Sequence, residues 1–201
     1  MIKCNVTVCG TVSQAASCRT NKEDNPIVCF AVNVVVPAKN GINKTIEVSV
    51  TKDGALDSVG SIAVGSRIEV TGVLVPKKRG DNMYWNLHAN SFNLTPTADK
   101  DSVTGELEFR GKVGKKIEDR QDKKGNDFLM FSAYSAEKVQ NGFEYIWVRF
   151  FSMNDSRDNR PWLQAGVRAS IKGTLTLSVF NDRLDFSCRV SEMSEYVVTP
   201  F

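Results

Sequence analysis

The sequence predicts an all-β protein made of two tandem five-stranded barrels. Three observations lead to this prediction. Apolar and polar residues alternate with a period of two along ten segments, which is the period of strands and not of helices. Many motifs of the first half recur in the second half. The length of 201 residues is also enough for two domains of about 100 residues each.

The internal repeat defines the domain organisation. Seven residues recur about 101 positions later: Gly10, Val12, Phe30, Gly65, Arg67, Gly72 and Leu74 return as Gly111, Val113, Phe131, Gly166, Arg168, Gly173 and Leu175. Repeats of this length are typical of duplicated domains rather than solenoid units. We therefore expect one domain over 1–95, a polar, proline-containing linker over 96–102 and a second domain over 103–201.

The strands of both copies follow from the alternating segments. In the first copy we expect strands at Ile2–Val12, Ile27–Val36, Thr45–Thr51, Arg67–Val75 and Tyr84–Leu94. In the second copy we expect them at Leu107–Val113, Phe128–Tyr134, Tyr145–Phe151, Arg168–Val179 and Leu184–Val190. Ala55–Ser61 and Arg157–Gln164 are the expected short helices. Five strands with a helix between the third and fourth is the order of an OB-fold barrel.

The third strand of the second copy carries an unusual outer face. Trp147, Arg149 and Phe151 point to one side of this strand, and the apolar residues between them point to the other. Because arginine does not normally face an apolar core, we expect the face with Trp147 to be the outer, ligand-binding one.

Several motifs of the second copy occur together in one known family. They are Gly111-Lys112-Val113, the glycine-led strand ending in Phe131-Ser132, Trp147-Val148-Arg149, the segment Trp162–Gly166, and Gly173-Thr174-Leu175. Their order resembles that of the bacterial-type single-stranded DNA-binding protein, over most of 105–190. The first copy keeps only scaffold positions. The resemblance implies tandem OB folds, single-stranded DNA binding and a homodimer with four barrels.

The resemblance has one clear departure. The family's long, glycine-rich, acidic tail is missing, although the chain stops on Pro200-Phe201 as that tail does. The resemblance implies that these two residues dock replication proteins. Without the resemblance, Pro200 and Phe201 would be interpreted as a frayed chain end.

The outward positions of the two copies differ in chemistry. The second copy offers Arg110, Lys112, Phe128, Tyr134, Trp147, Arg149 and Phe151, where the first offers Thr7, Thr11, Ile27, Asn33, Glu47, Ser49 and Thr51. Aromatic rings stack on bases of any sequence, worth roughly 1–3 kcal/mol each, and cations neutralise phosphates. We therefore expect the second copy to be the principal binding platform and the first to contribute through its loops.

Two basic segments are expected to be loops that hold nucleic acid. In the first copy, Lys77, Lys78 and Arg79 precede Tyr84 and Trp85, between strands four and five. OB folds use this loop to bind oligonucleotides. In the second copy, the loop between strands one and two begins with Lys115 and Lys116, and acidic residues dilute the basic ones that follow.

These candidates have simpler interpretations that the sequence leaves open. Trp147 could lie in an interface between domains or subunits, since aromatic residues serve interfaces equally well. Of the neighbours Tyr84 and Trp85, one must face inward in a strand. The run Lys77–Arg79 could be only a solvated hairpin tip.

Composition excludes several other classes of protein. A net charge of +3 is too small to indicate nucleic-acid binding by itself. The spacing of the five cysteines, Cys4, Cys9, Cys18, Cys29 and Cys188, fits neither a zinc site nor a disulfide framework, so we expect reduced thiols. There is no apolar leader and no uninterrupted apolar run of membrane-spanning length. We expect a cytoplasmic protein of a bacterial or virus-infected cell.

Nothing in the sequence indicates catalysis or a cofactor. The single histidine, His88, lies in an expected strand, and Asp155 and Asp158 are expected in a polar loop where they serve solubility. No phosphate loop or metal-ligand cluster is present. We expect a non-enzymatic protein that coats and protects single-stranded DNA during replication or recombination, with RNA as a possible variant. The alternative is a protein-interaction or viral structural module whose aromatic face is a subunit interface.

Overall fold

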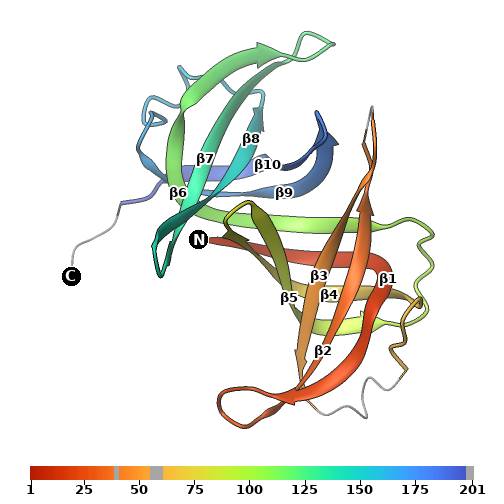
Figure 1. Ribbon diagram of the computed structural model, residues 1–201. Coiled ribbons are helices and arrows are strands. Elements are labelled where there is room, and N and C mark those ends of the chain that lie inside the picture. The colour runs from red at the N-terminus through yellow and green to blue at the C-terminus, as the bar shows by residue number, and fades with distance from the viewer. Residues whose placement is uncertain (39–40, 55–60, 198–201) are drawn as a thin grey trace. The chain divides into compact units, whose positions relative to one another are not determined.

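The computed structural model describes residues 1–38, 41–54 and 61–197, and these form ten strands and no helix (Figure 1). The strands of the first copy are β1 Ile2–Thr20, β2 Pro26–Val36, β3 Lys44–Asp53, β4 Arg67–Arg79 and β5 Asn82–Asn93. Those of the second copy are β6 Ser102–Gln121, β7 Asp127–Val139, β8 Gly142–Met153, β9 Arg168–Phe180 and β10 Arg183–Glu195. The predicted all-β class is confirmed.

The chain divides into two compact units that do not follow the halves of the sequence strictly. One unit consists of 4–105 and 178–184, and we call it the N-unit. The other consists of 1–3, 106–177 and 185–201, and we call it the C-unit. The boundaries expected from the repeat, with a linker over 96–102, stay a prediction.

Each unit has the strand pairing of an OB fold. In the N-unit, β1 pairs antiparallel with β2 and β4, β2 with β3, and β4 with β5, while β3 and β5 run parallel. The C-unit repeats this pattern with β6 to β10. The parallel seam joins only Val48–Thr51 to Trp85–His88 in one unit and Ser187–Arg189 to Arg149–Phe151 in the other. These seams are short, and the barrels are not closed, so the expectation of closed barrels is wrong.

The predicted helix at Arg157–Gln164 is wrong. This segment forms successive turns, in which Arg160 N–H donates to Arg157 O at 3.0 Å and Leu163 N–H to Arg160 O at 2.9 Å. Pro161 has no N–H and disfavours the α conformation of the residue before it, so a regular helix cannot form there. The other expected helix, Ala55–Ser61, lies outside the described residues except for Ser61.

The two basic segments expected to be loops are in fact strands. Lys77–Arg79 is the end of β4, and a tight turn at Gly80-Asp81 connects it to β5. Lys115 and Lys116 lie within β6, which continues past a register shift between Val113 and Ile117. Such a bulge bends a strand and lets it pair further, which explains why β6 outruns its predicted end.

Buried aromatic rings form the centre of the C-unit. The rings of Phe109 and Phe150 lie 5.0 Å apart, and those of Phe131 and Phe150 lie 5.2 Å apart. All three side chains are almost fully buried, as is Phe30 in the N-unit. Phe30 and its repeat counterpart Phe131 thus both belong to the hydrophobic core of their unit. No helix among the described residues is long and apolar enough to cross a membrane.

The five cysteines are free thiols in this structure. Cys4, Cys9 and Cys188 are buried and Cys18 is exposed. Burial raises the pKa of the Cys188 thiol to about 12, so this group stays protonated and unreactive at neutral pH.

Candidate nucleic-acid interface

Four side chains form a row across the outer face of the C-unit. Lys112 on β6 pairs directly with Tyr134 on β7 and with Arg168 on β9, and Tyr134 pairs with Trp147 on β8. Directly paired residues of neighbouring strands project to the same face of a sheet. The row Arg168–Lys112–Tyr134–Trp147 therefore joins two cations to two aromatic rings.

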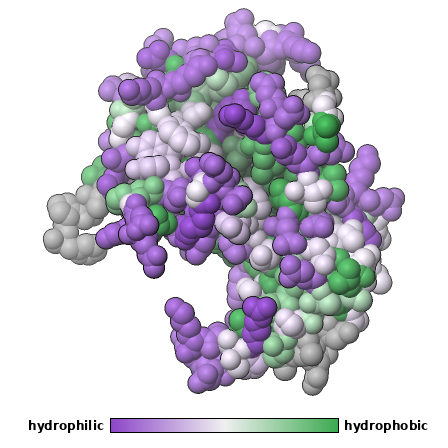
Figure 2. All heavy atoms as spheres, viewed as in Figure 1, coloured by the Kyte–Doolittle hydropathy of each residue, from purple (hydrophilic) through white to green (hydrophobic). Residues whose placement is uncertain are grey.

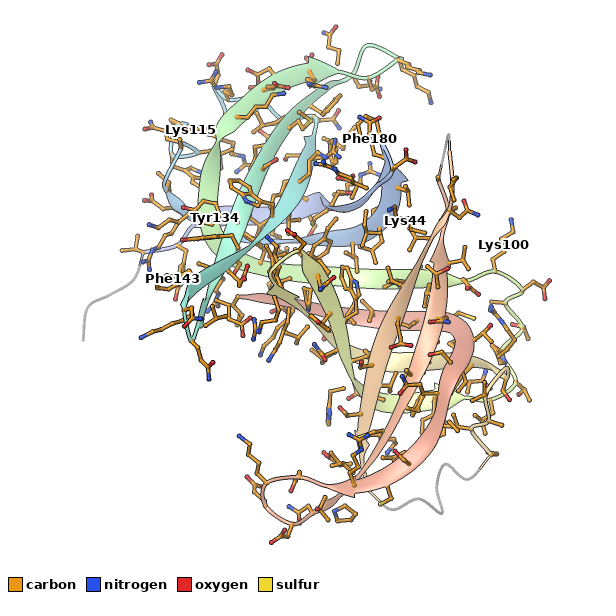
Figure 3. All side chains as sticks on the ribbon, viewed as in Figure 1. Lys44, Lys100, Lys115, Tyr134, Phe143 and Phe180 are labelled. Atoms are coloured by element: carbon orange, nitrogen blue, oxygen red, sulfur yellow. The ribbon has the colours of Figure 1, made fainter. Side chains whose placement is uncertain are left out.

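The rings of this row are in contact and accessible. Tyr134 and Trp147 have ring centroids 4.8 Å apart, and Tyr134 and Tyr145 have theirs 5.5 Å apart. Trp147 is 53% exposed and Tyr145 is 44% exposed. Phe143, which is labelled with Tyr134 in Figure 3, is 58% exposed. The C-unit thus presents an aromatic surface that its own core does not use.

A glycine determines how the indole of Trp147 lies. A Cβ atom at Gly114 would be 2.9 Å from Trp147 Cζ3 and 3.0 Å from the carbonyl oxygen of Ser132. The ring therefore rests against the backbone of β6. Part of the ring is still available for stacking, because Trp147 is 53% exposed.

Basic side chains lie beside the indole. Lys115 and Lys116 line a cavity of about 670 Å³ together with Gly114, Tyr134 and Trp147. The Glu118 carboxylate forms an ion pair with Lys116 Nζ at 2.9 Å. The hydrogen bond from Lys116 lowers the pKa of Glu118 most, and the hydrogen bond from Arg120 lowers it further. Lys116 is therefore partly neutralised. Lys115, labelled in Figure 3, is exposed and has no ion pair with any described residue.

Arg149 and Phe151 form a second part of this face. The Arg149 guanidinium lies 5.9 Å from the centroid of the Phe151 ring and forms an ion pair with Asp185. The Phe151 and Phe128 rings are 6.2 Å apart. The predicted Arg149 is thus on the outer face as expected, but a carboxylate offsets its charge.

Hydropathy on this side of the molecule is mixed. In Figure 2, pale side chains of intermediate hydropathy lie among purple, hydrophilic ones. Exposed aromatic residues bordered by charged ones are typical of binding surfaces.

The N-unit has the equivalent row with different chemistry. Its members are Arg67, Thr11, Asn33 and Glu47, paired in the same way. Arg67 forms an ion pair with Asp101, and Glu47 accepts a hydrogen bond from Ser13 Oγ at 3.1 Å. This row offers no aromatic ring, and its cation is neutralised.

The basic hairpin of the N-unit is only partly available at the surface. Lys77 lies opposite Tyr84, and Arg79 lies opposite Asn82. Tyr84 is 49% exposed, whereas Trp85 is 3% exposed and belongs to the core. The expectation that Trp85 would contact DNA is corrected, because strand alternation turns the residue after Tyr84 inward. Lys78 lies on the same hairpin and is half-buried.

Other predicted residues have separate outcomes. Arg110 is exposed, and its guanidinium lies 5.1 Å from the centroid of the Tyr196 ring. Pro200 and Phe201 lie outside the described residues. The surface residues that we did not predict are Phe143, Tyr145 and Arg168. Alternation in β8 could have identified Phe143 and Tyr145, since they share the parity of Trp147, whereas Arg168 was interpreted only as a scaffold position of the repeat.

Asp155 is not the solvated carboxylate expected from the sequence. It is buried and accepts hydrogen bonds from Ser152 Oγ at 2.7 Å, Arg160 Nε at 3.0 Å and Ser156 N–H at 3.0 Å. Burial alone would raise the pKa of Asp155, but these hydrogen bonds outweigh it and hold the pKa below 3.8. The carboxylate therefore fixes the turns that follow β8.

Metal-binding geometry is lacking within the described ranges. No group of three or more histidine, cysteine or acidic side chains there could hold a metal ion. His88 Nε2 lies 3.6 Å from Asp53, and both side chains are largely exposed. Neither observation indicates a catalytic centre.

Comparisons with known proteins identify similar solved structures only. No protein-family model and no curated protein matches this sequence. The wild-type single-stranded DNA-binding protein from Thermus aquaticus is 13% identical with a TM-score of 0.48, covering 100% of this chain and 95% of its own. The small single-stranded DNA-binding protein from Streptomyces coelicolor is 22% identical with a TM-score of 0.38, covering 49% of this chain and 95% of its own.

A mitochondrial single-stranded DNA-binding protein from S. cerevisiae is also similar. It is 13% identical with a TM-score of 0.37, and the match covers 45% of this chain and 91% of that one. At these identities and TM-scores we base the function on the geometry of the surface alone.

Proposed function

We propose that this protein binds single-stranded DNA without base preference, through the aromatic and cationic face of the C-unit. The observation that carries this proposal is the contact between the exposed ring of Trp147 and Tyr134, in line with Lys112 on the neighbouring strand. Bases stack on the rings and phosphates interact with the lysines. We expect the protein to coat and protect strands exposed during DNA replication or recombination.

The chemistry of the face supports stacking without sequence readout. An aromatic ring stacks with any base, each contact being worth roughly 1–3 kcal/mol. Reading a sequence needs planar amide or guanidinium groups aimed at base edges. Here Lys112 and Lys115 are flexible point charges, which suit phosphates of any sequence. Of the arginines on this face, Arg149 is paired with Asp185, Arg110 lies against the Tyr196 ring, and Arg168 is separated from the stacking rings by Lys112. The same face could also bind RNA, for which we see no specific reader of the 2′-hydroxyl.

Exposed aromatic residues also support a second candidate function. Phe143, Tyr145 and Trp147 lie on one strand face and are each more than two-fifths exposed, at 58%, 44% and 53%. Such residues are enriched in protein interfaces. In this alternative the face joins subunits of an assembly, and nucleic acid does not bind there.

A titration with a dT oligonucleotide separates the two functions. For the first function, binding should quench tryptophan fluorescence in the wild type, and the quench should be lost in Trp147→Ala. The logarithm of affinity should fall with the logarithm of salt concentration by about 0.7 per phosphate contacted. An absence of binding at low salt would contradict the proposal and favour the second function, in which the face joins subunits.

The oligomeric state belongs to the same proposal. We expect a homodimer with four OB units, and we expect replication proteins to be recruited through Pro200 and Phe201. The mass in solution, measured with and without a dT strand, tests the dimer. A monomer under both conditions would contradict it.

A further inference from the structure

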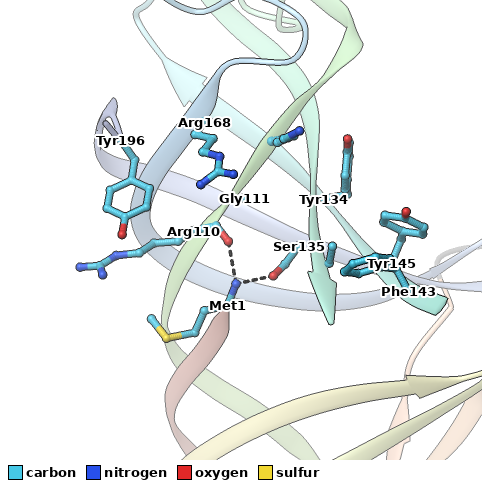
Figure 4. Close-up of a pocket in the computed structure, with 11 residues that line it drawn as sticks. Met1, Arg110, Gly111, Tyr134, Ser135, Phe143, Tyr145, Arg168 and Tyr196 are labelled. Atoms are coloured by element: carbon cyan, nitrogen blue, oxygen red, sulfur yellow. Dashed lines mark hydrogen bonds between the residues drawn. The ribbon is translucent and has the colours of Figure 1, made fainter. Parts of the chain in front are cut away.

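A second cavity lies next to the stacking face, within the C-unit (Figure 4). Its volume is about 630 Å³, which is in the range of small-molecule sites. Tyr134 lines this cavity and also the one beside Trp147. The two cavities are therefore neighbours that share one aromatic ring.

The cavity is strongly cationic. Arg110, Lys112 and Arg168 line it, and no carboxylate does so among the described lining residues. Lys112 and Arg168 are direct cross-strand partners and form no ion pair with any described residue. Two neighbouring positive charges that lack a counterion among the described residues favour an anionic ligand.

The walls are aromatic as well as cationic. Phe143, Tyr145 and Tyr196 also line the cavity, as does Met1, whose terminal ammonium group donates to Arg110 O and Ser135 Oγ. Figure 4 shows the Arg168 side chain extending between Tyr196 and Tyr134. The Arg110 guanidinium lies against the Tyr196 ring, so this arginine is oriented by a cation–π contact. A phosphate with an attached base matches this combination of charges and rings.

The N-unit provides an internal comparison for Arg168. Its counterpart Arg67 occupies the same place in the strand pairing, opposite Thr11. There Asp101 forms an ion pair with the guanidinium, and the hydrogen bond that Arg67 donates to Asp101 raises the pKa of Arg67. The same position is thus neutralised in one unit and available in the other.

We infer that Arg168 and Lys112 form a phosphate-binding subsite for the strand that stacks on Trp147. The bound strand passes from Trp147 over Tyr134 into this cavity, and so crosses β8, β7, β6 and β9 in turn. Arg168 is then a further DNA-binding residue of the C-unit. This inference rests on the proposed function and specifies the path of the ligand.

The salt dependence of dT binding tests this subsite. Arg168→Gln and Lys112→Gln should each reduce the slope of log affinity against log salt by about 0.7, while Trp147 is still quenched by bound DNA. Arg168→Lys keeps the charge and should keep the slope, which separates loss of charge from misfolding. The matched control is Arg67→Gln with Asp101→Asn, which removes the corresponding pair in the N-unit and should leave the slope unchanged.

Each outcome separates this inference from the function on which it rests. Unchanged slopes in Arg168→Gln and Lys112→Gln, with normal quenching, overturn the subsite and leave the stacking face intact. No quenching in the wild type at low salt overturns both. If a polyglutamate peptide binds in place of dT and loses affinity in these two variants, the cavity is a site for acidic peptides and the inference is wrong.

Discussion

At the scale of single residues, Gly114 determines whether Trp147 can stack. A methyl group at position 114 would lie 2.9 Å from the indole, closer than such atoms approach one another. Gly114→Ala should therefore tilt the ring and weaken dT binding several-fold. A double-mutant cycle measures this effect, because Gly114→Ala should cost nothing further in a Trp147→Ala background. Equal losses in both backgrounds would mean that Gly114 acts independently of the ring.

Asp185 reduces the charge that Arg149 can offer to a phosphate. The two side chains form an ion pair beside the Phe151 ring. Asp185→Asn should raise the affinity for dT by about 3- to 10-fold at low salt, because a repelling carboxylate is removed. The gain should shrink as salt is raised. Fluorescence titration measures both effects, and weaker binding by Asp185→Asn would show that the carboxylate instead holds Arg149 in its binding position.

The buried carboxylate of Asp155 makes stability depend on acid pH. The pKa of Asp155 is held below 3.8 in the folded protein, so the unfolded state binds a proton first as pH falls. Its stabilisation is complete above about pH 5 and is lost as pH falls below 3.8 toward the folded pKa. The wild type should exceed Asp155→Asn in free energy of unfolding by about 1–3 kcal/mol at neutral pH.

Urea unfolding at a series of pH values checks this expectation. The difference between the wild type and Asp155→Asn should narrow in the acid range and stay constant near neutrality. A difference that is independent of pH would show that the Asp155 carboxylate is not ionised in the folded protein.

Among the strands, β8 places a residue that stabilises the fold next to a residue that we expect to bind DNA. Phe150 is fully buried between Phe109 and Phe131, whereas Phe151 lies on the outer face. Phe150→Ala should cost about 3–5 kcal/mol of unfolding free energy. Phe151→Ala should cost much less stability and should weaken dT binding. Chemical denaturation and titration of both variants measure this, and equal destabilisation would contradict the assigned strand faces.

The same alternation explains which elements the sequence could predict. Period-two patterns identified all ten strands, and the parity of Trp147 with Arg149 identified the outer face of β8. The ends of the strands were harder to predict. The continuation of β6 past Val113 depends on a bulge, after which β6 pairs with β7 again from Ile117 onward. The helix at 157–164 was mispredicted because Pro161 and the hydrogen bonds to Asp155 favour successive turns.

The residues of the candidate site could be predicted only where the alternation within a single strand identifies them. Tyr134, Trp147 and Lys112 each followed from the alternation of their own strand. Arg168 joins them through cross-strand pairing with Lys112, and this register cannot be read from one segment. The ion pair of Arg67 with Asp101 is likewise a contact between distant segments that no local pattern indicates.

In the molecule as a whole, the two units share one pattern of strand pairing and differ in their surfaces. Equivalent strand pairings place Tyr134 and Trp147 in the C-unit where the N-unit has Asn33 and Glu47. We therefore expect stacking to depend on the C-unit, because the outer row of the N-unit has only polar side chains.

Titration of a labelled dT oligonucleotide with paired variants, followed by the anisotropy of the label, tests whether the C-unit carries the binding face. Tyr134→Ala with Trp147→Ala should lower the affinity by at least 10-fold, since each lost stacking contact is worth roughly 1–3 kcal/mol. Asn33→Ala with Glu47→Ala changes the equivalent positions of the N-unit and should leave the affinity within about 2-fold of the wild type. Equal losses in the two paired variants would contradict the claim that the C-unit carries the binding face.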